Sequence, residues 1–195
     1  MKVYDISQEI LSSNVYPGDP EPEIIKLYDM NKGDLYNLSA FSMCAHNGTH
    51  IDAPAHFIKN GKTVEEIPLD KFVGNCFVAE INGDVTETSA INILNKANEM
   101  DAGERILIKG KATVTLDAAK VFAENKIKLI GNESQSVGPL EAPMAVHLTL
   151  LNAEIVLLEG VVLNEVKEGK YFLNAAPLNL KNFEGSPCRA YLIEY

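Results

Sequence analysis

The chain has 195 residues, of which 46% are hydrophobic and 23% are charged, the balance of a globular protein that buries a core. Its 17 Lys and Arg residues against 27 Asp and Glu residues give a net charge of −10, which disfavours nucleic acid and anionic membrane surfaces as partners. The densest apolar run, 155–163, is too short to span a membrane, and the acidic N-terminal segment lacks the apolar region of a signal peptide, so we expect a cytoplasmic protein.

The N-terminal part of the chain consists of extended segments separated by turns. Alternating and β-branched residues predict strands at 2–7, 23–29 and 35–44. Between the first two, the sequence VYPGDP predicts a type II turn with Pro17 and Gly18 at its centre.

From residue 63 onward, predicted helices alternate with predicted strands. A capping box formed by Thr63 and Glu66 predicts a short helix that ends near Pro68. Later helices are predicted at 86–100, at 116–124 and from Pro143 to about Leu151, with Asn152 as a left-handed end. Apolar runs predict strands at 75–81, 105–110, 128–131, 155–163, 171–180 and 189–195. This order predicts a mixed α/β fold in a single domain, residues 1–195, whose sheet is not purely parallel.

The segment 46–57, HNGTHIDAPAHF, contains three of the four histidines. The glycine between His46 and His50 predicts a turn that brings the two imidazoles together. A proline disfavours a helix beyond that turn, so we expect extended backbone with His50, Asp52 and His56 on one face. Imidazole and carboxylate ligands suit Zn²⁺ and also accept Mn²⁺ or Fe²⁺. The cluster therefore predicts a metal or catalytic site, against the alternative that polar residues simply cap turns.

Two further residues fit the same chemistry. His147 lies on the helix that begins at Pro143, among apolar neighbours, and Glu159 interrupts the apolar strand over 155–163. A carboxylate in such a run is costly unless it is paired, protonated or bound to metal, or unless it faces solvent from an edge strand. Given the first cluster, the economical interpretation is that His147 and Glu159 complete one metal site.

HNGTHIDAPAHF resembles the HxGTHxDxPxHF signature of the cyclase family, which includes bacterial kynurenine formamidases and isatin hydrolases. The blocks YDIS, VYPGD, SVGP and HLTLLNAEIVLLEGV are similar to family blocks in the same order, so the resemblance spans nearly the whole chain. It implies a swivelling β/β/α architecture and a homodimer or higher homo-oligomer.

The resemblance also implies a binuclear metal site, with zinc as the expected ion and manganese as the alternative. His46, His50 and Asp52 would bind the first ion. Asp52 would bridge to the second ion, which His147 would bind, and Glu159 would contact both.

Two more positions of the family pattern carry roles. His56 matches the catalytic histidine that binds no metal, and Tyr16 falls where an aromatic residue packs against the substrate. Kynurenine formamidases typically have tryptophan there, whereas this chain contains no Trp. A second departure is Asn132-Glu133, where the family more often has Ile-Asp or Thr-Asp.

These roles imply hydrolysis of a small-molecule amide, in which His56 takes a proton from the attacking water and returns it to the leaving amine. The expected activity is that of an arylformamidase, converting N-formyl-L-kynurenine to L-kynurenine and formate in tryptophan catabolism. The alternatives are an isatin-hydrolase-like enzyme for cyclic amides and a non-catalytic protein that binds metal or a small ligand.

Several polar residues near these motifs have simpler interpretations. The three cysteines match no zinc or redox spacing and are predicted to be reduced thiols, with Cys44 as a small buried side chain. Asp5 and Asp19 are interpreted as turn anchors.

Overall fold

The computed structural model describes residues 1–195. It contains three α-helices, α1 (Glu87–Glu99), α2 (Leu116–Glu124) and α3 (Met144–Asn152). Its strands are β1 (Lys2–Asp5), β2 (Glu23–Tyr28), β3 (Leu38–Ser42), β4 (His50–Asp52), β5 (Val73–Glu80), β6 (Gly83–Val85), β7 (Arg105–Lys109), β8 (Ala112–Val114), β9 (Leu129–Asn132), β10 (Val156–Glu159), β11 (Gly169–Asn174), β12 (Gly185–Pro187) and β13 (Tyr191–Glu194). Four short 3₁₀ helices are η1 (Met30–Lys32), η2 (Pro54–His56), η3 (Val64–Glu66) and η4 (Leu69–Lys71).

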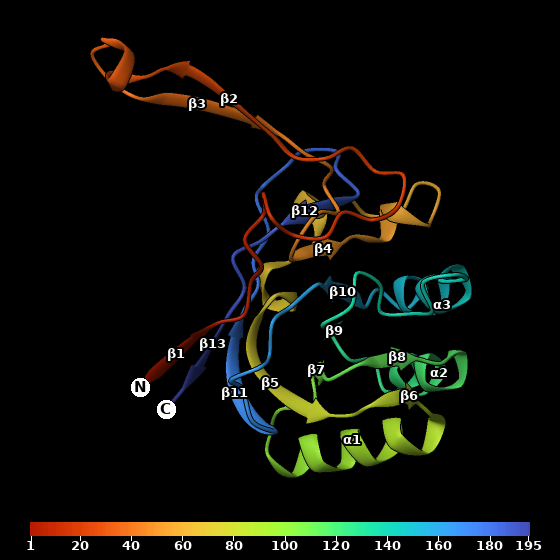
Figure 1. The fold of residues 1–195 in the computed structure, drawn as a ribbon. Helices are drawn as coiled ribbons and strands as arrows, with labels where there is room; N and C mark the ends of the chain where they lie inside the picture. Colours follow the sequence, from red (N-terminus) through yellow and green to blue (C-terminus); the bar gives the residue numbers. More distant parts are fainter.

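Nine of the strands form one mixed sheet in the order β1-β13-β11-β5-β7-β9-β10-β4-β12 (Figure 1). Its centre, β5, β7, β9 and β10, is parallel, and the strands on both sides pair antiparallel. This arrangement confirms the predicted mixed α/β class. The parallel strands need crossover connections, and α1 and α2 supply two of them.

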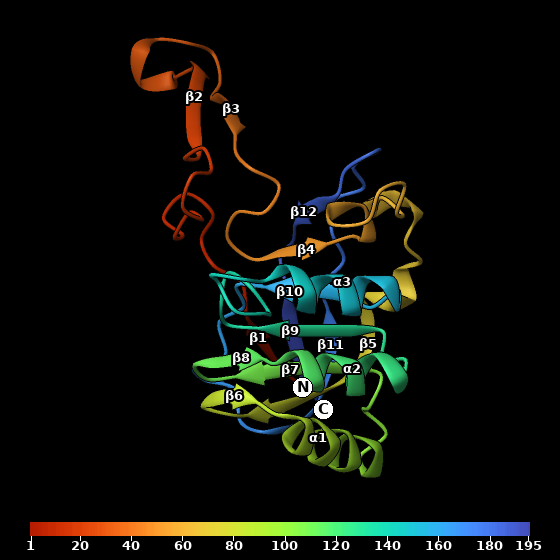
Figure 2. The same cartoon turned by 90° about the vertical axis from the view of Figure 1, so that its right-hand side faces the viewer.

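The three α-helices lie side by side on one face of the sheet (Figure 2). Threonine side chains cap two of them, since Thr86 accepts from the Ser89 amide and Thr115 from the Ala118 amide. Ala90, Ile93 and Phe122 are buried in the core cluster between helices and sheet.

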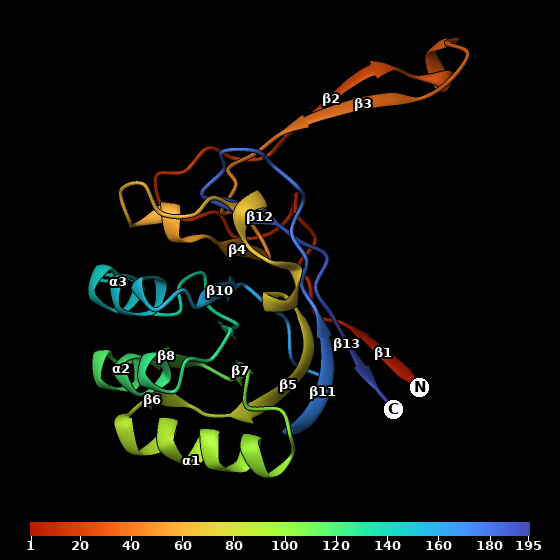
Figure 3. The same ribbon diagram turned by 180° about the vertical axis from the view of Figure 1, so that it is seen from behind.

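A second core cluster fills the opposite face, where the sheet curls over itself (Figure 3). It joins Leu107, Leu129 and Leu158 of the central strands to residues of the outer strands, such as Ile51 and Leu192. The alternation of side chains along each strand therefore assigns neighbouring residues to two different cores. None of the helices is long and apolar enough to cross a membrane.

Residues 23–42 form an arm that projects from the body of the molecule (Figures 1 and 3). The arm consists of the antiparallel pair β2 and β3 with η1 at its tip. Every residue of β2 is exposed. The exposed large apolar side chains of the arm are Ile24, Ile25, Leu27, Tyr28, Met30, Leu35, Tyr36, Leu38 and Phe41.

Most predicted elements are confirmed. The errors concern where elements end and three short strands that were not predicted, β6, β8 and β12. The capping box of Thr63 and Glu66 is present, as are the helices over 87–99 and 116–124. The predicted end at Asn152 is wrong, because the helix includes that residue and Glu154 has the left-handed φ of 57°. The strand predicted over 155–163 ends at Glu159, because Gly160 turns the chain with a φ of 69°. The strand predicted over 171–180 ends at Asn174.

Candidate metal centre

The register of β4 against β10 brings the first three polar residues together. His50 lies opposite Glu159, and Asp52 lies opposite Leu157. Ile51 between them points into the second core, so His50 and Asp52 point to the face covered by the helices. Glu159 shares that face with Leu157, which packs in the helix-side core. The strand β10 lies between β9 and β4, so Glu159 is on an internal strand and is only 3% exposed.

The helix α3 presents His147 to the same place. The Nδ1 atom of His147 lies 2.9 Å from the carbonyl oxygen of Pro143, and Nδ1 of His50 lies 3.1 Å from that of Gly48. A carbonyl oxygen only accepts, so each ring donates its Nδ1 proton to the backbone. The Nε2 atom of each ring is thereby turned toward the carboxylates, as in metal sites whose histidines are oriented by backbone acceptors.

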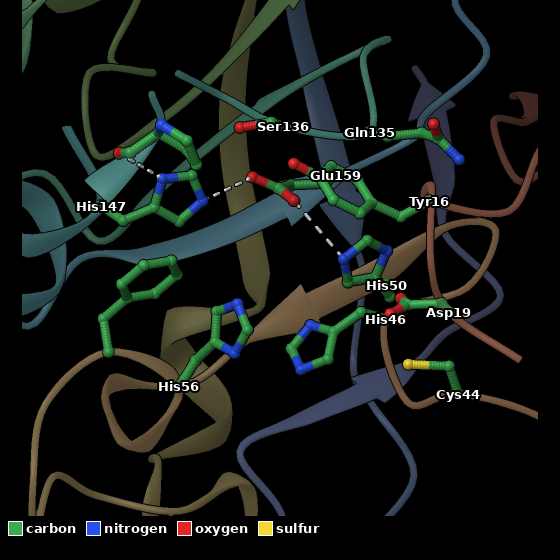
Figure 4. Close-up of a pocket in the computed structure, with 12 residues that line it drawn as sticks. Tyr16, Asp19, Cys44, His46, His50, His56, Gln135, Ser136, His147 and Glu159 are labelled. Carbon is green, nitrogen blue, oxygen red and sulfur yellow. Dashed lines mark hydrogen bonds and ion pairs between the residues drawn. The ribbon is translucent and has the colours of Figure 1, made fainter. Parts of the chain in front are cut away.

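The carboxylates and histidines form two clusters that share Asp52. Figure 4 shows their histidines and Glu159. In the first, Asp52 Oδ1 lies 2.8 Å from His46 Nδ1 and 3.4 Å from His50 Nε2. In the second, His147 Nε2 lies 3.2 Å from Glu159 Oε1 and 3.7 Å from Asp52 Oδ2. Glu159 Oε2 faces back to the first cluster, 3.5 Å from His50 Nε2. Each carboxylate thus offers one oxygen to each cluster.

Charge and hydrogen bonding make this a site for cations. Asp52 Oδ2 and His46 Nε2 are buried and have no hydrogen-bond partner. The ion-pair partners of Asp52 and Glu159 are all histidines, without a lysine or arginine. Buried carboxylates without a fixed cation are costly unless protons or metal ions neutralise them. The nitrogen and oxygen donors present therefore fit divalent metal ions.

The histidine pKa values reflect the same electrostatics. Burial alone would lower the pKa of His50, but hydrogen bonds to Asp52 and Glu159 raise it to about 10. Burial alone would also lower the pKa of His147, but the hydrogen bond to Glu159 raises it above its ordinary value. Burial opposes ionisation of Asp52 too, yet His46 and His50 hold its pKa well below the ordinary value. Metal ions would take the place of these protons, so binding should release protons.

His46 reaches the cluster from the turn before β4. Gly48 has a φ of 64°, which confirms the predicted turn between His46 and His50. Opposite Asp52 on β12 lies Gly185, and a Cβ atom at this position would collide with the His46 ring. A glycine here leaves the space in which that ring lies.

His56 lies beside the clusters without belonging to either. The prediction of extended backbone as far as His56 is wrong, because β4 ends at Asp52 and residues 54–56 form η2. Proline is tolerated in the first turn of a helix, where its missing N–H is not needed. The His56 ring stacks on His46 with centroids 4.0 Å apart, and its Nε2 lies 3.9 Å from Asp52 Oδ2. Its side chain is 30% exposed to the cavity, and burial lowers its pKa.

A cavity of about 290 Å³ opens above the clusters, near the lower limit for small-molecule sites. Tyr16 lines it, at the predicted turn, where the Asp19 amide donates to the Tyr16 carbonyl and Gly18 has a φ of 100°. The Tyr16 hydroxyl donates to the carbonyl oxygen of Leu140, 3.1 Å away. Neither lysine nor arginine lines the cavity.

The departure at Asn132-Glu133 has a structural role. Glu133 accepts hydrogen bonds from the amides of Gly110, at 2.7 Å, and Leu163, at 2.9 Å. Asn132 donates to the carbonyl oxygen of Ser136, 3.0 Å away. The pair therefore fixes the loop that follows β9 to the segments after β7 and β10.

Six cavity residues had no predicted role at the site: Asp19, Cys44, Phe57, Gln135, Ser136 and Pro143. The motifs VYPGD and SVGP contain Asp19 and Ser136 and were the available signal. Cys44 is half-buried and lines the cavity, whereas a buried position was predicted, and burial raises its thiol pKa. Asp5 anchors the chain after β1, as interpreted, since its carboxylate accepts from the Ser7 amide, 3.1 Å away. The hydrogen bonds from Arg189 lower the pKa of Asp5 to about 2.

Comparison with known proteins places this site in context. The Cyclase family model matches residues 4–139. The kynurenine formamidase of Bacillus anthracis is 33% identical, over 98% of this chain and 97% of its own length. The kynurenine formamidase of Salinibacter ruber is 31% identical, over 98% of this chain and 97% of its own length.

Solved structures agree with these relatives. A predicted metal-dependent hydrolase from Bacillus stearothermophilus is 30% identical and superposes with a TM-score of 0.80, covering 98% of this chain and 97% of its own. Isatin hydrolase A from Labrenzia aggregata is 21% identical with a TM-score of 0.79, covering 98% and 93%, and shares the fold.

Proposed function

This chain belongs to the cyclase family, and we propose that it is an arylformamidase that hydrolyses N-formyl-L-kynurenine to L-kynurenine and formate. The protein is a metal-dependent hydrolase that acts on carbon–nitrogen bonds other than peptide bonds. The observation that carries the proposal is the pair of His/carboxylate clusters that share Asp52 beneath one small cavity. Pairs of titratable groups with opposed pKa shifts in a cavity are typical of active sites.

Two divalent metal ions are proposed for the site. Zinc is the expected ion, and manganese is the alternative. His46, His50 and Asp52 would hold one ion, and His147 would hold the other together with the oxygens that Asp52 and Glu159 direct to it. When bound, such ions activate water at neutral pH and polarise an amide carbonyl.

His56 is proposed as the group that moves the proton. It lies in the cavity wall, stacked on His46, and both ring nitrogens remain outside the two clusters. It would accept a proton from the water that attacks the formyl carbon and donate it to the aniline nitrogen as the carbon–nitrogen bond breaks. The transfer matters because an amide anion is a poor leaving group.

The cavity limits the size of the substrate. Tyr16 would pack against the aryl ring from the turn over residues 15–20, while its hydroxyl remains bonded to Leu140. Phe57, whose ring centroid lies 4.8 Å from that of His147, adds a second aromatic side chain to the cavity lining. A single-ring formanilide matches this enclosure better than a peptide.

The test compares the rate of N-formyl-L-kynurenine hydrolysis by chelator-treated protein with that of the same sample restored with Zn²⁺ or Mn²⁺. We expect hydrolysis to vanish on treatment and return with at least one ion. Isatin is assayed in parallel. Hydrolysis of isatin without hydrolysis of N-formyl-L-kynurenine would contradict the arylformamidase proposal and indicate a cyclic-amide hydrolase.

His56→Ala separates an enzyme from a protein that only binds metal. We expect this variant to retain its bound metal, measured by elemental analysis, and to lose hydrolysis. Equal hydrolysis by wild type and variant would contradict the role of His56.

We also propose that the protein acts in the cytoplasm as a homodimer, and that the arm forms the contact. The exposed apolar side chains of the arm present on the order of 1,000 Å², compared with about 800 Å² that each partner buries in a standard interface. Leaving such a surface in water is unusual for a monomer. The arm emerges between Asp19 and Cys44, which both line the cavity, so a partner that holds the arm would also steady one cavity wall.

A further inference from the structure

Ser136 has an unused hydroxyl at the cavity. The residue lies in the loop that follows β9 and lines the cavity beside Glu159 (Figure 4). It is 3% exposed, and its Oγ atom has no hydrogen-bond partner. Buried hydroxyls in native proteins nearly always have a partner, because an unpaired one loses its hydrogen bonds to water without compensation. An unpaired hydroxyl in a cavity wall therefore indicates a partner that arrives with a ligand.

The backbone on both sides of Ser136 is held in place. Asn132 donates to its carbonyl oxygen, 3.0 Å away, and its amide donates to Ser134 Oγ, 3.3 Å away. The next amide, that of Val137, donates to Glu159 Oε1, 2.7 Å away. Because Glu159 belongs to the metal clusters, this bond sets the backbone of Ser136 at a defined position beside them. A donor fixed before the ligand binds needs little reorganisation when it is used.

The surroundings exclude two other roles for this hydroxyl. A nucleophilic serine needs a base within hydrogen-bond distance, and Oγ of Ser136 has no partner at all. As a metal ligand, the neutral hydroxyl of Ser136 is weaker than the carboxylates and imidazoles that the two clusters already supply. The remaining role is that of a hydrogen-bond donor to an oxygen atom of the bound molecule.

We propose that Ser136 Oγ donates a hydrogen bond to the formyl oxygen of the substrate, and that this bond strengthens in the transition state. The inference rests on the proposed function. When water adds to the formyl carbon, the π electron pair of the carbonyl moves to its oxygen, and the negative charge there strengthens the bond from Ser136. Ser136 keeps its proton throughout, so it stabilises the oxyanion without taking part in proton transfer.

Ser136→Ala tests the proposal by kinetics. We expect kcat to fall on the order of 10²-fold, as for removal of one oxyanion donor in other hydrolases, with KM changed by less than about threefold. Metal content should equal that of the wild type. Ser136→Thr keeps the hydroxyl and should recover part of the lost kcat.

Binding gives a readout that needs no turnover. A phosphonamidate of aniline presents a tetrahedral anionic oxygen where formanilide has its carbonyl. Its dissociation constant, measured by calorimetry with metal-loaded protein, should rise on the order of 10²-fold in Ser136→Ala. L-kynurenine lacks the formyl oxygen, so its dissociation constant should not change.

Ser186→Ala is the matched control for stability. Ser186 is also fully buried, but its hydroxyl accepts from the Leu178 amide and donates to the Pro187 carbonyl oxygen. In the ligand-free protein, Ser186→Ala should lower the thermal midpoint, whereas Ser136→Ala should leave it unchanged or raise it. A fall of the midpoint in Ser136→Ala as large as in Ser186→Ala would show that the hydroxyl has a structural partner, and would overturn the proposal.

The outcomes separate the two proposals. Wild-type protein that hydrolyses formamides, with Ser136→Ala equal to it in kcat and in phosphonamidate binding, overturns the role of Ser136 alone. Wild-type protein that hydrolyses no formamide overturns the proposed function, and the role of Ser136 with it.

Discussion

The cavity has two walls that differ in how the chain builds them. The sheet wall consists of His50, His147 and Glu159 with Asp52 behind them, on two paired strands and one helix, and all four are buried. The arm-root wall consists of Tyr16, Asp19 and Cys44, on the turn before β2 and the loop after β3, and all three are half-buried. One hydrogen bond, from Tyr16 to Leu140, joins the arm-root wall to the segment before α3.

This difference indicates that the two walls have different roles. Metal ligands must be held to fractions of an ångström, and paired strands and a packed helix position four of the five proposed ligands, whereas His46 comes from the turn before β4. The arm-root wall leads directly into the arm, so its position depends in part on whatever holds the arm. Substitutions in the sheet wall should therefore change metal binding and kcat, and substitutions in the arm-root wall or the arm should change KM and assembly.

Glu159→Gln should have the largest effect. The variant removes one negative charge that both clusters share, so we expect loss of bound metal and a fall in kcat/KM on the order of 10³-fold. Elemental analysis and hydrolysis of N-formyl-L-kynurenine measure both. Glu154→Gln is the control, since Glu154 forms an exposed ion pair with Lys62, and it should keep full metal content. Full metal content in Glu159→Gln would contradict the proposal that the sheet wall binds the metal ions.

Gly185→Ala should weaken the first cluster alone. The added methyl group collides with the His46 ring, so this ligand must shift, and metal affinity should fall by about 10- to 100-fold. A competition titration with a chromogenic chelator measures the change. Weakening of only one of two binding events would support separate clusters, whereas unchanged affinity would contradict the place assigned to His46.

Charged substitutions in the arm test its proposed role as the dimer contact. Ile24 and Phe41 form an exposed cross-strand pair, and replacing both with lysine should raise the dimer dissociation constant by about tenfold or more. The sedimentation velocity of a dilution series measures it. Val3→Lys on β1, equally exposed, should leave assembly unchanged. A wild-type protein that is monomeric at micromolar concentration would contradict the role of the arm.

Tyr16→Phe should have the smallest effect. The variant keeps the aromatic ring and loses the bond to Leu140, which is worth about 1 kcal/mol, so KM should rise a few-fold while kcat stays constant. Steady-state kinetics with N-formyl-L-kynurenine measures the change. A fall in kcat with constant KM would mean that Tyr16 acts on the chemical step and that the two walls are not separate.

The sequence predicted much of the site because its ligands are unusual where they occur. Burying the carboxylate of Glu159 in an apolar strand, or the three histidines within 46–57, costs free energy unless these groups pair or bind a common ligand. This holds before any fold is known. The helices at 87–99 and 116–124 were equally accessible, since threonine caps and apolar periodicity are local signals. The roles assigned to the site residues remain predictions.

Only the tertiary structure decided the rest, because it depends on residues far apart in the chain. The register of β4 against β10 sets His50 opposite Glu159, and no local pattern contains that pairing. The space for His46 is left by Gly185 on β12, and the position of Ser136 depends on bonds to Asn132 and Glu159. The ends of β10 and α3 were misjudged for the same reason, since the residues with positive φ that follow them, Gly160 and Glu154, bond to distant segments. The Gly160 amide donates to the Ser134 carbonyl oxygen, and Lys71 donates to that of Glu154. Sequence thus determined which groups the site contains, and the fold determined where each atom of those groups lies.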